Sequence, residues 1–116
     1  MKILFYLQLA WHWLAYITTL VEPERLQSNL GVTYFKLGDF HRAIARLKKS
    51  ERVRHSKDSS FGRYNAYYLG FSYMNLGDYR AAIAYFEEYL RFRPADAHAK
   101  EVIDWCQEQL DSNGEK

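Results

Sequence analysis

Cysteine is nearly absent from this chain, and its scarcity excludes several classes of protein. Cys106 is the single cysteine among 116 residues, so no disulfide can form within the chain. The sequence contains no CxxC or CxxCH pattern, which excludes zinc ribbons and covalently attached c-type haem. We interpret Cys106 as a small packing residue of a helix rather than as a reactive thiol.

The chain also lacks the short motifs that mark many enzymes. It contains no HExxH, no GxSxG and no phosphate-binding loop. Its four histidines are scattered along the sequence without the spacing of a metal site. The sequence therefore predicts a protein that is not an enzyme and that uses neither a metal nor a cofactor.

Net charge is low, at +2, but the charges are unevenly distributed. Residues 36–63 carry nine Lys or Arg against three Asp or Glu, whereas residues 78–116 carry five against nine. Arg42, Arg46 and Lys49 fall on one helical face. This basic face is either simply solvated or meets acidic lipid headgroups or an acidic protein. No nucleic-acid-binding module accompanies it, so no nucleic acid is expected as a partner.

What the chain does contain is a segment that occurs twice. LGVTYFKLGDFHRAI, at 30–44, is followed thirty-nine residues later by LGFSYMNLGDYRAAI, at 69–83. Self-similarity at a fixed period is typical of repeat architectures, in which each unit is one supersecondary element.

Each copy predicts two antiparallel helices joined by a tight turn. Apolar residues recur at helical spacing on both sides of a Gly-Asp pair. Gly38 and Gly77 are expected to end the first helix, because glycine adopts the left-handed conformation without penalty, and the following aspartate caps the second. Small residues, such as Gly31 and Ala43, let the two helices approach closely. We therefore predict an all-α fold of stacked helical hairpins.

The pattern resembles the tetratricopeptide repeat (TPR). The resemblance is carried by the Leu-Gly pair, the Tyr three residues later, the Gly-Asp-aromatic turn, the Ala three residues past that aromatic and, in the second copy, Pro94. The first copy departs from the pattern, because it has Gln27 where the family often places an aromatic and it lacks the closing proline. The resemblance implies an α-solenoid of antiparallel helical hairpins, preceded here by an apolar N-terminal helix.

The expected organisation follows from the two copies and their flanks. The usual repeat length is about 34 residues, so the longer offset indicates an inserted loop. The predicted segments are an apolar N-terminal helix at 1–21, a first repeat unit at 22–55, a loop at 56–62, a second unit at 63–94, a capping helix at 95–110 and a tail at 111–116.

Members of this family usually hold a peptide or a helix in a concave groove lined by the first helix of each repeat. Carried over by the repeat phase, the groove residues are Arg25, Ser28, Val32, Phe35, Lys36, Tyr64, Tyr67, Phe71, Met74 and Asn75. Such an aromatic, weakly polar surface favours an apolar helix or an extended segment as ligand. Chaperone-binding members clamp a terminal carboxylate with Lys and Asn, but Ser28 and Val32 stand at two of those positions, so that ligand is not expected.

The first twenty-one residues, MKILFYLQLAWHWLAYITTLV, form a different kind of sequence. The stretch is long enough to cross a bilayer, and Lys2 is its only charged residue. Lys2 precedes it and Glu22 and Glu24 follow it, which by the positive-inside rule places the repeats outside the cytoplasm, in the periplasm if the protein is bacterial. We expect an uncleaved membrane anchor over 3–21. The alternatives are a cleaved signal peptide and a helix that packs on the first repeat of a soluble cytoplasmic protein.

These observations favour a non-catalytic adaptor or scaffold that binds a protein partner, as a small subunit of a membrane-associated complex. Two alternatives stay open. One is a cofactor-bearing membrane subunit, in which His12 ligates the metal of a tetrapyrrole. The other is a soluble oligomer that assembles itself, since the acidic helix at 95–110 could dock onto the basic face of a neighbouring copy.

Overall fold

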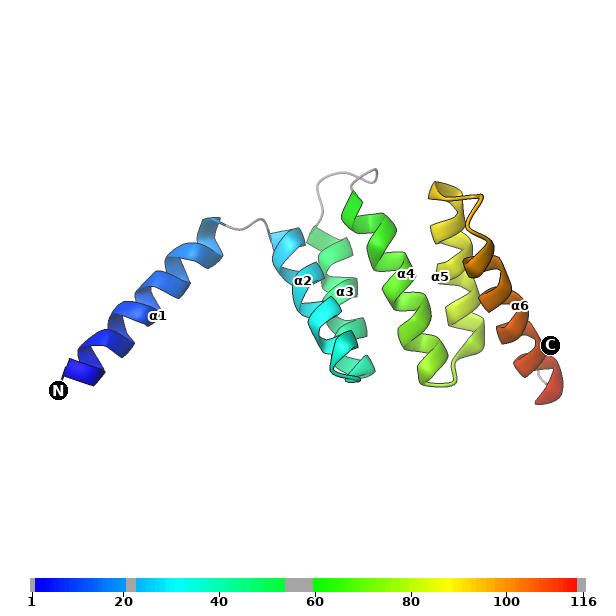
Figure 1. The fold of residues 1–116 in the computed structure, drawn as a ribbon, viewed down its shortest axis with the longest axis horizontal. Coiled ribbons are helices and arrows are strands. Elements are labelled where there is room, and N and C mark those ends of the chain that lie inside the picture. The colour runs from blue at the N-terminus through cyan, green and yellow to red at the C-terminus, as the bar shows by residue number, and fades with distance from the viewer. Residues whose placement is uncertain (1, 21–22, 54–59, 115–116) are drawn as a thin grey trace.

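The structure of the protein is a computed structural model that describes residues 2–20, 23–53 and 60–114. Every regular element in these ranges is an α-helix. The helices are α1 (Lys2–Leu20), α2 (Pro23–Lys36), α3 (Phe40–Val53), α4 (Ser60–Asn75), α5 (Tyr79–Phe92) and α6 (Ala97–Ser112). The helix pairs α2–α3 and α4–α5 form antiparallel hairpins, and α6 follows the second of them (Figure 1). The all-α fold of stacked hairpins predicted from the sequence is therefore confirmed.

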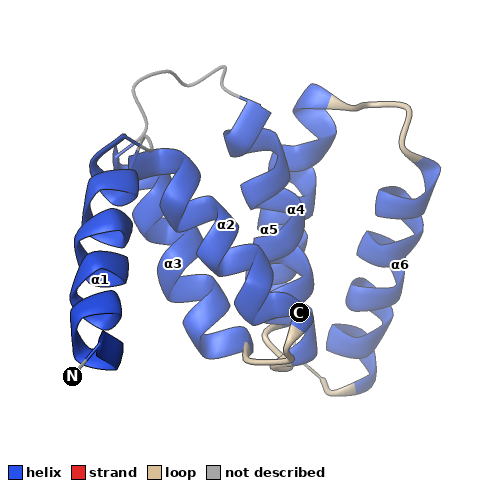
Figure 2. Ribbon diagram, turned by 60° about the vertical axis from the view of Figure 1, so that its left-hand side comes forward, coloured by secondary structure: helices blue, strands red, loops and turns tan. Residues whose placement is uncertain are grey.

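The hairpins stack in chain order. Helix α3 packs on α4 and α5 packs on α6, while α2 also contacts α4. Both ribbon views show α2 to α6 as one continuous layer of neighbouring helices (Figures 1 and 2). The loop predicted at 56–62 falls partly in residues 54–59, which lie outside the described ranges, and α4 already begins at Ser60.

Both hairpin turns have the geometry that their Gly-Asp pairs predict. Gly38 and Gly77 have φ angles of 80° and 82°, in the region that side chains rarely adopt. Asp39 and Asp78 each accept a hydrogen bond at 3.2 Å from the backbone N–H three residues later. The first helix of each hairpin therefore ends at glycine and the second begins at an aspartate cap.

Glycine also allows the two helices of each hairpin to touch. A Cβ added to Gly31 would lie 2.5 Å from Leu47 Cγ, and one added to Gly70 would lie 2.8 Å from Phe86 Cζ. Both distances are far shorter than a van der Waals contact. A large side chain on the second helix thus fills the space that the missing side chain on the first helix leaves open.

The apolar interior is built from small, aliphatic and aromatic residues of α3, α4, α5 and α6. The buried apolar residues in the described ranges are Ala43, Leu47, Ala66, Leu69, Ala82, Phe86, Tyr89, Ala99, Cys106 and Leu110. Burial raises the pKa of the Cys106 thiol, so this side chain packs in its neutral form between α5 and α6.

A chain of buried polar side chains joins the two hairpins. The Ser28 hydroxyl of α2 donates to Asn65 Oδ1 of α4 at 2.8 Å, and Asn65 Nδ2 donates to Ser50 Oγ of α3 at 3.0 Å. Asn65 and Ser50 are fully buried, and Ser28 is 3% exposed. Buried polar groups need such partners, so this network fixes how α4 sits against the first hairpin.

A second polar contact holds α6 on the second hairpin. Tyr89 Oη of α5 donates to Asp96 Oδ2 at 2.8 Å, while Asp96 Oδ1 caps α6 by accepting from the Ala99 N–H at 3.1 Å. The bond from Tyr89 and the Ala99 N–H lower the pKa of Asp96. Burial and the same hydrogen bond raise the pKa of Tyr89 to about 12.

We expect this contact to be visible in the pH dependence of stability. Asp96 has a lowered folded-state pKa, so its contribution is present above the unfolded value, about 4, and lost as the pH falls through the folded one. Tyr89 has a raised folded-state pKa, so its contribution is present below about pH 10 and lost as the pH rises. The stability advantage of the wild type over Tyr89→Phe should therefore be greatest at neutral pH and shrink toward both extremes.

Urea unfolding from pH 2 to 12 measures this difference. Asp96→Asn keeps an oxygen that caps α6, its amide NH2 can donate to the Tyr89 oxygen instead, and it does not titrate. It should therefore remove only the loss of stability at low pH. A difference between wild type and Tyr89→Phe that does not vary with pH would show that the bond is not made.

Helix α1 stands apart from the stack. It forms no extensive contact with another described helix, and Figure 1 shows it projecting from the end that carries α2. Eight of its large side chains are strongly exposed, with fractions from 49% for Leu9 to 75% for Ile3. The membrane-spanning helix predicted over 3–21 finds no support, because none of the described helices combines the length and the apolar character needed to cross a bilayer.

Candidate functional site

The groove residues predicted from the sequence lie on α2 and α4, the first helices of the two hairpins. These two helices contact each other, and Phe71 of α4 stacks on His98 of α6 with 6.2 Å between ring centroids. The outer side chains of α2, α4 and α6 therefore form one surface, which we call the first-helix surface. Its members are Arg25, Val32, Phe35, Lys36, Tyr64, Tyr67, Phe71, Met74, Asn75 and His98.

These side chains differ in how far they reach solvent. Arg25, Lys36, Tyr64 and Asn75 are exposed, whereas Val32, Phe35, Tyr67, Phe71 and Met74 are half-buried. Tyr64 is the most accessible of the aromatic rings, with 55% of its surface exposed. The surface thus has polar residues and one tyrosine at its edge and partly covered rings at its centre.

The half-buried rings pack on one another and on the core. Phe35 of α2 meets Tyr68 of α4 edge to face, with 5.1 Å between centroids, and Tyr67 meets Phe71 at 4.8 Å. Phe71 also packs against the buried Phe86, at 4.9 Å. Burial raises the pKa of Tyr67, so its phenol is neutral at physiological pH. These rings contribute to folding and still present an apolar edge to a ligand.

One predicted groove residue does not reach this surface. Ser28 lies in the interior, where its hydroxyl takes part in the Asn65 network. The repeat phase assigns Ser28 to the groove by its position in α2 alone. The structure places it at the junction of the hairpins instead.

Two residues that the sequence interpretation did not include contact members of this surface. Tyr68 contacts Phe35, and His98 stacks on Phe71. His98 lies 34 residues after Tyr64. That offset is the usual repeat length, so continuing the repeat phase into the capping helix would have found it. Tyr68 offers no comparable signal, because it directly follows Tyr67 and points toward α2.

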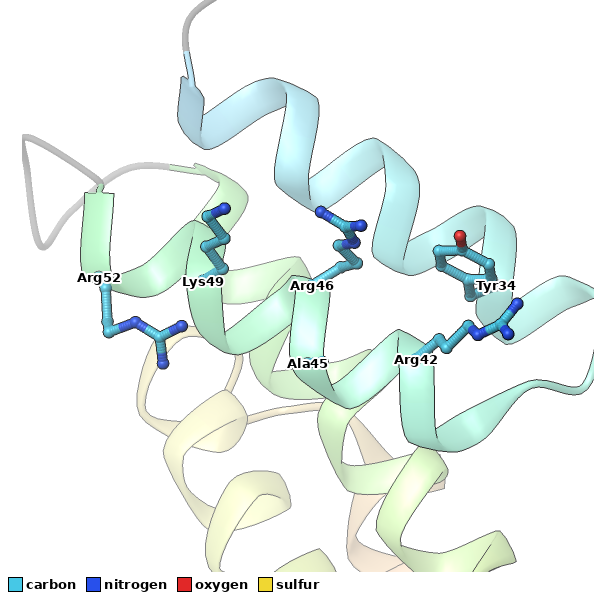
Figure 3. A pocket seen from close by; sticks show the side chains of 6 residues that line it. All are labelled: Tyr34, Arg42, Ala45, Arg46, Lys49 and Arg52. Atoms are coloured by element: carbon cyan, nitrogen blue, oxygen red, sulfur yellow. The ribbon is translucent and has the colours of Figure 1, made fainter.

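The predicted basic residues Arg42, Arg46 and Lys49 are brought together in an open pocket of about 510 Å³. Tyr34 of α2 and Arg52 of α3 also line it. Figure 3 shows Arg46 and Lys49 rising from α3 toward α2, with Arg42 beside the Tyr34 ring. We call Tyr34, Arg42, Arg46, Lys49 and Arg52 the basic edge.

Local contacts position the arginines of the basic edge. Arg42 lies over the Tyr34 ring, 5.8 Å from its centroid, and its Nε is 3.4 Å from Asp39. Arg46 Nη1 donates to Gln27 Oε1 at 3.3 Å. Gln27 stands where the repeat pattern often has an aromatic, and this bond gives its buried amide a partner.

The remaining candidate, His12, is exposed on α1 between the exposed Trp11 and Trp13. Across the described ranges, no cluster of three or more His, Cys, Asp or Glu side chains is arranged to hold a metal ion.

Comparison with known protein families agrees with the two hairpins. Two family models, both described as tetratricopeptide repeat, match residues 24–54 and 64–96. No curated protein and no solved structure gives a significant match. The matched segments cover α3 and α5 and nearly all of α2 and α4, and together they make up more than half of the sequence. The chain therefore belongs to the tetratricopeptide repeat family, whose repeats serve as scaffolds for protein–protein interaction.

Proposed function

We propose that this protein is a non-catalytic adaptor that holds an apolar helix or an extended segment of a partner protein on its first-helix surface. We further propose that α1 attaches the adaptor to a larger, membrane-associated complex, with the repeats on the extracytoplasmic side. The family supports the general role. The first-helix surface supports the choice of ligand, and the exposed side chains of α1 support the attachment. The proposed side of the membrane rests on the order of Lys2, Glu22 and Glu24 in the sequence.

The composition of the first-helix surface carries the assignment of the ligand. Tyr64 stands exposed beside the half-buried rings of Tyr67 and Phe71, with Lys36 and Asn75 at the edge. Tyrosine offers a large apolar area and a polar tip, and it is common in binding sites that few residues dominate. The two charged members of the surface, Arg25 and Lys36, are exposed, whereas the half-buried rings at its centre carry no charge. The surface is therefore suited to a partner that buries apolar side chains.

The exposure of α1 supports attachment to a second partner. Ile3, Leu4, Leu7, Trp11 and Trp13 each leave between 60% and 75% of their surface uncovered. Contiguous apolar surface of this kind marks sites that a partner or a lipid environment covers. An apolar environment within a membrane complex would bury these side chains while the hairpins stay in water.

Substitution of exposed residues separates binding from folding. Tyr67 and Phe71 are unsuitable, because they pack on the core. We therefore choose Lys36→Ala/Tyr64→Ala/Asn75→Ala on the first-helix surface. The matched control is His41→Ala/Glu87→Ala/Arg91→Ala, three exposed residues on the second helices α3 and α5.

The measurement is quantitative affinity purification of the full chain from its own cells in mild detergent. We expect the first-helix variant to lose at least one partner by about tenfold or more, and the control to retain it, because few residues dominate such interfaces. If the first-helix variant is folded and keeps every partner, the ligand assignment is refuted. Recovery of the wild-type chain in the membrane fraction tests the attachment separately.

A further inference from the structure

The basic edge lies where a preceding helix would pack. In the second hairpin the equivalent residues are Tyr73 and Tyr85, thirty-nine positions after Tyr34 and Arg46. Tyr73 and Tyr85 stack at 5.6 Å, and Lys48 of the first hairpin lies over the Tyr73 ring at 5.3 Å. This face of the second hairpin is therefore a helix-packing interface. On the first hairpin, no helix in the described ranges occupies the corresponding place.

The positive charge of this face of the first hairpin determines which kind of ligand can bind there. Arg42, Arg46, Lys49 and Arg52 follow one another at spacings of four, three and three residues, so they form a stripe along α3. Asp39 forms an ion pair with Arg42, the first residue of the stripe, at 3.4 Å. Like charges at this spacing repel one another. An acidic ligand would relieve that repulsion, whereas the apolar α1 would not.

The opposite end of the stack carries the complementary stripe. Glu101, Asp104, Glu108 and Asp111 are exposed on α6 at spacings of three, four and three residues. They lie on the side of α6 away from its buried residues. Within the described part of the chain none of these four carboxylates forms an ion pair. We call them the acidic stripe.

The two stripes are opposite in sign and equal in number of charges and in length. Each has four charges, and its first and last charges are ten positions apart, which corresponds to about 15 Å along a helix. The helices that carry them lie toward opposite ends of the row from α2 to α6 (Figure 1). We infer that two copies of this protein associate head to tail, with the acidic stripe of one copy docked on the basic edge of the next.

This contact joins two different surfaces, so a pair of copies still has one basic edge and one acidic stripe unoccupied. Association can therefore continue into short chains of copies. A row of adaptors would present several first-helix surfaces side by side. This inference is independent of the proposed ligand, because it uses neither Tyr64 nor the rings beside it.

Sedimentation equilibrium of the full chain tests the contact. The solution contains a density-matched non-ionic detergent, which covers α1 and leaves charges unaffected. We expect self-association at about 20 mM salt that weakens tenfold or more at about 500 mM, because salt screens exposed charges. Association that is driven by α1 would not weaken with salt.

Charge reversal identifies the surfaces. The variant Arg42→Glu/Lys49→Glu/Arg52→Glu makes the basic edge acidic and leaves the acidic stripe unchanged. We expect it to be monomeric, because both of its docking surfaces then carry negative charge. The variant Glu101→Lys/Asp104→Lys/Glu108→Lys, basic at both ends, should also be monomeric. Mixed in equal amounts, the two should associate again, since each then meets its opposite.

The control variant Lys36→Glu/Arg91→Glu/Arg93→Glu has the same change in net charge as the first variant, but its three exposed positions lie outside both the basic edge and the acidic stripe. It should associate as the wild type does. A wild-type chain that is monomeric at low salt would overturn the inference. So would two folded reversal variants that still self-associate, or that fail to associate when mixed.

Discussion

Phe86→Ala is expected to lower the free energy of unfolding by about 3–5 kcal/mol, the usual cost of truncating a buried phenylalanine. Phe86 is fully buried, packs on Phe71 and fills the space beside Gly70. Small domains are stable by about 5–15 kcal/mol, so this loss should unfold much of the population at modest urea concentrations. Urea denaturation followed by circular dichroism measures it.

The matched control is Tyr64→Ala, which truncates an aromatic ring that is 55% exposed. We expect the free energy of unfolding to change by no more than about 0.5 kcal/mol, as for most surface substitutions.

The contact between Phe86 and Gly70 gives a further test, because Gly70→Ala should change the stability in opposite directions with and without the Phe86 ring. In the wild type, Gly70→Ala should destabilise, because its Cβ meets the Phe86 ring. In the Phe86→Ala background it should stabilise, because the ring is gone and alanine favours the helix. Equal effects in both backgrounds would refute the close approach.

The second large effect is expected for Asn65→Ala. This substitution removes the acceptor of the Ser28 hydroxyl and the donor to Ser50 Oγ, both at buried positions. Loss of a partner for a buried polar group costs about 1–3 kcal/mol, and the small cavity adds to it. We expect a total of about 2–4 kcal/mol in the same urea experiment.

Asn75→Ala is the control for this prediction. It removes an asparagine from the same helix, but that side chain is exposed and bonds only to the Phe71 carbonyl, at 2.7 Å. The triple variant Ser28→Ala/Ser50→Ala/Asn65→Leu should be more stable than Asn65→Ala alone, because none of the three side chains then keeps an unsatisfied polar group. If Asn65→Ala is no more damaging than Asn75→Ala, the network does not hold the hairpins together.

The features that the sequence predicted well depend on single residues or near neighbours. Gly38 needs a positive φ, Asp39 needs only the N–H three residues ahead, and Gly31 leaves room that any large facing side chain fills. These requirements repeat in both copies. The turns, the hairpins and their close contact could therefore be inferred without coordinates.

The features that the sequence did not predict depend on contacts between hairpins. Ser28 and Asn65 are 37 residues apart and polar, so each by itself resembles a surface residue. His98 joins the first-helix surface because α6 brings it against Phe71. Tyr67 and Phe71 were predicted as groove residues from the repeat phase, and in the structure both are half-buried on α4. How deeply these two rings are buried depends on how α5 and α6 pack against them. The repeat phase of α4 carries no information about that packing.

The N-terminal segment shows the limit of composition as a guide. A membrane anchor, a signal peptide and a packed helix all need a long apolar stretch, so the sequence left all three open. In the structure residues 2–20 form a helix, and the large side chains described between Ile3 and Leu14 are exposed. Whatever covers these side chains therefore lies outside the described fold.

Site-specific photo-crosslinking in the cells that make this protein tests most directly whether the first-helix surface is where a partner binds. A photoreactive side chain is placed, one position at a time, at the exposed residues Lys36 and Tyr64 on that surface. The comparison positions are His41 and Glu87 on the second helices. We predict a covalent adduct with the same partner protein from Lys36 and Tyr64 and none from His41 or Glu87. Adducts that form only from the second helices, or equally from all four positions, would contradict the account.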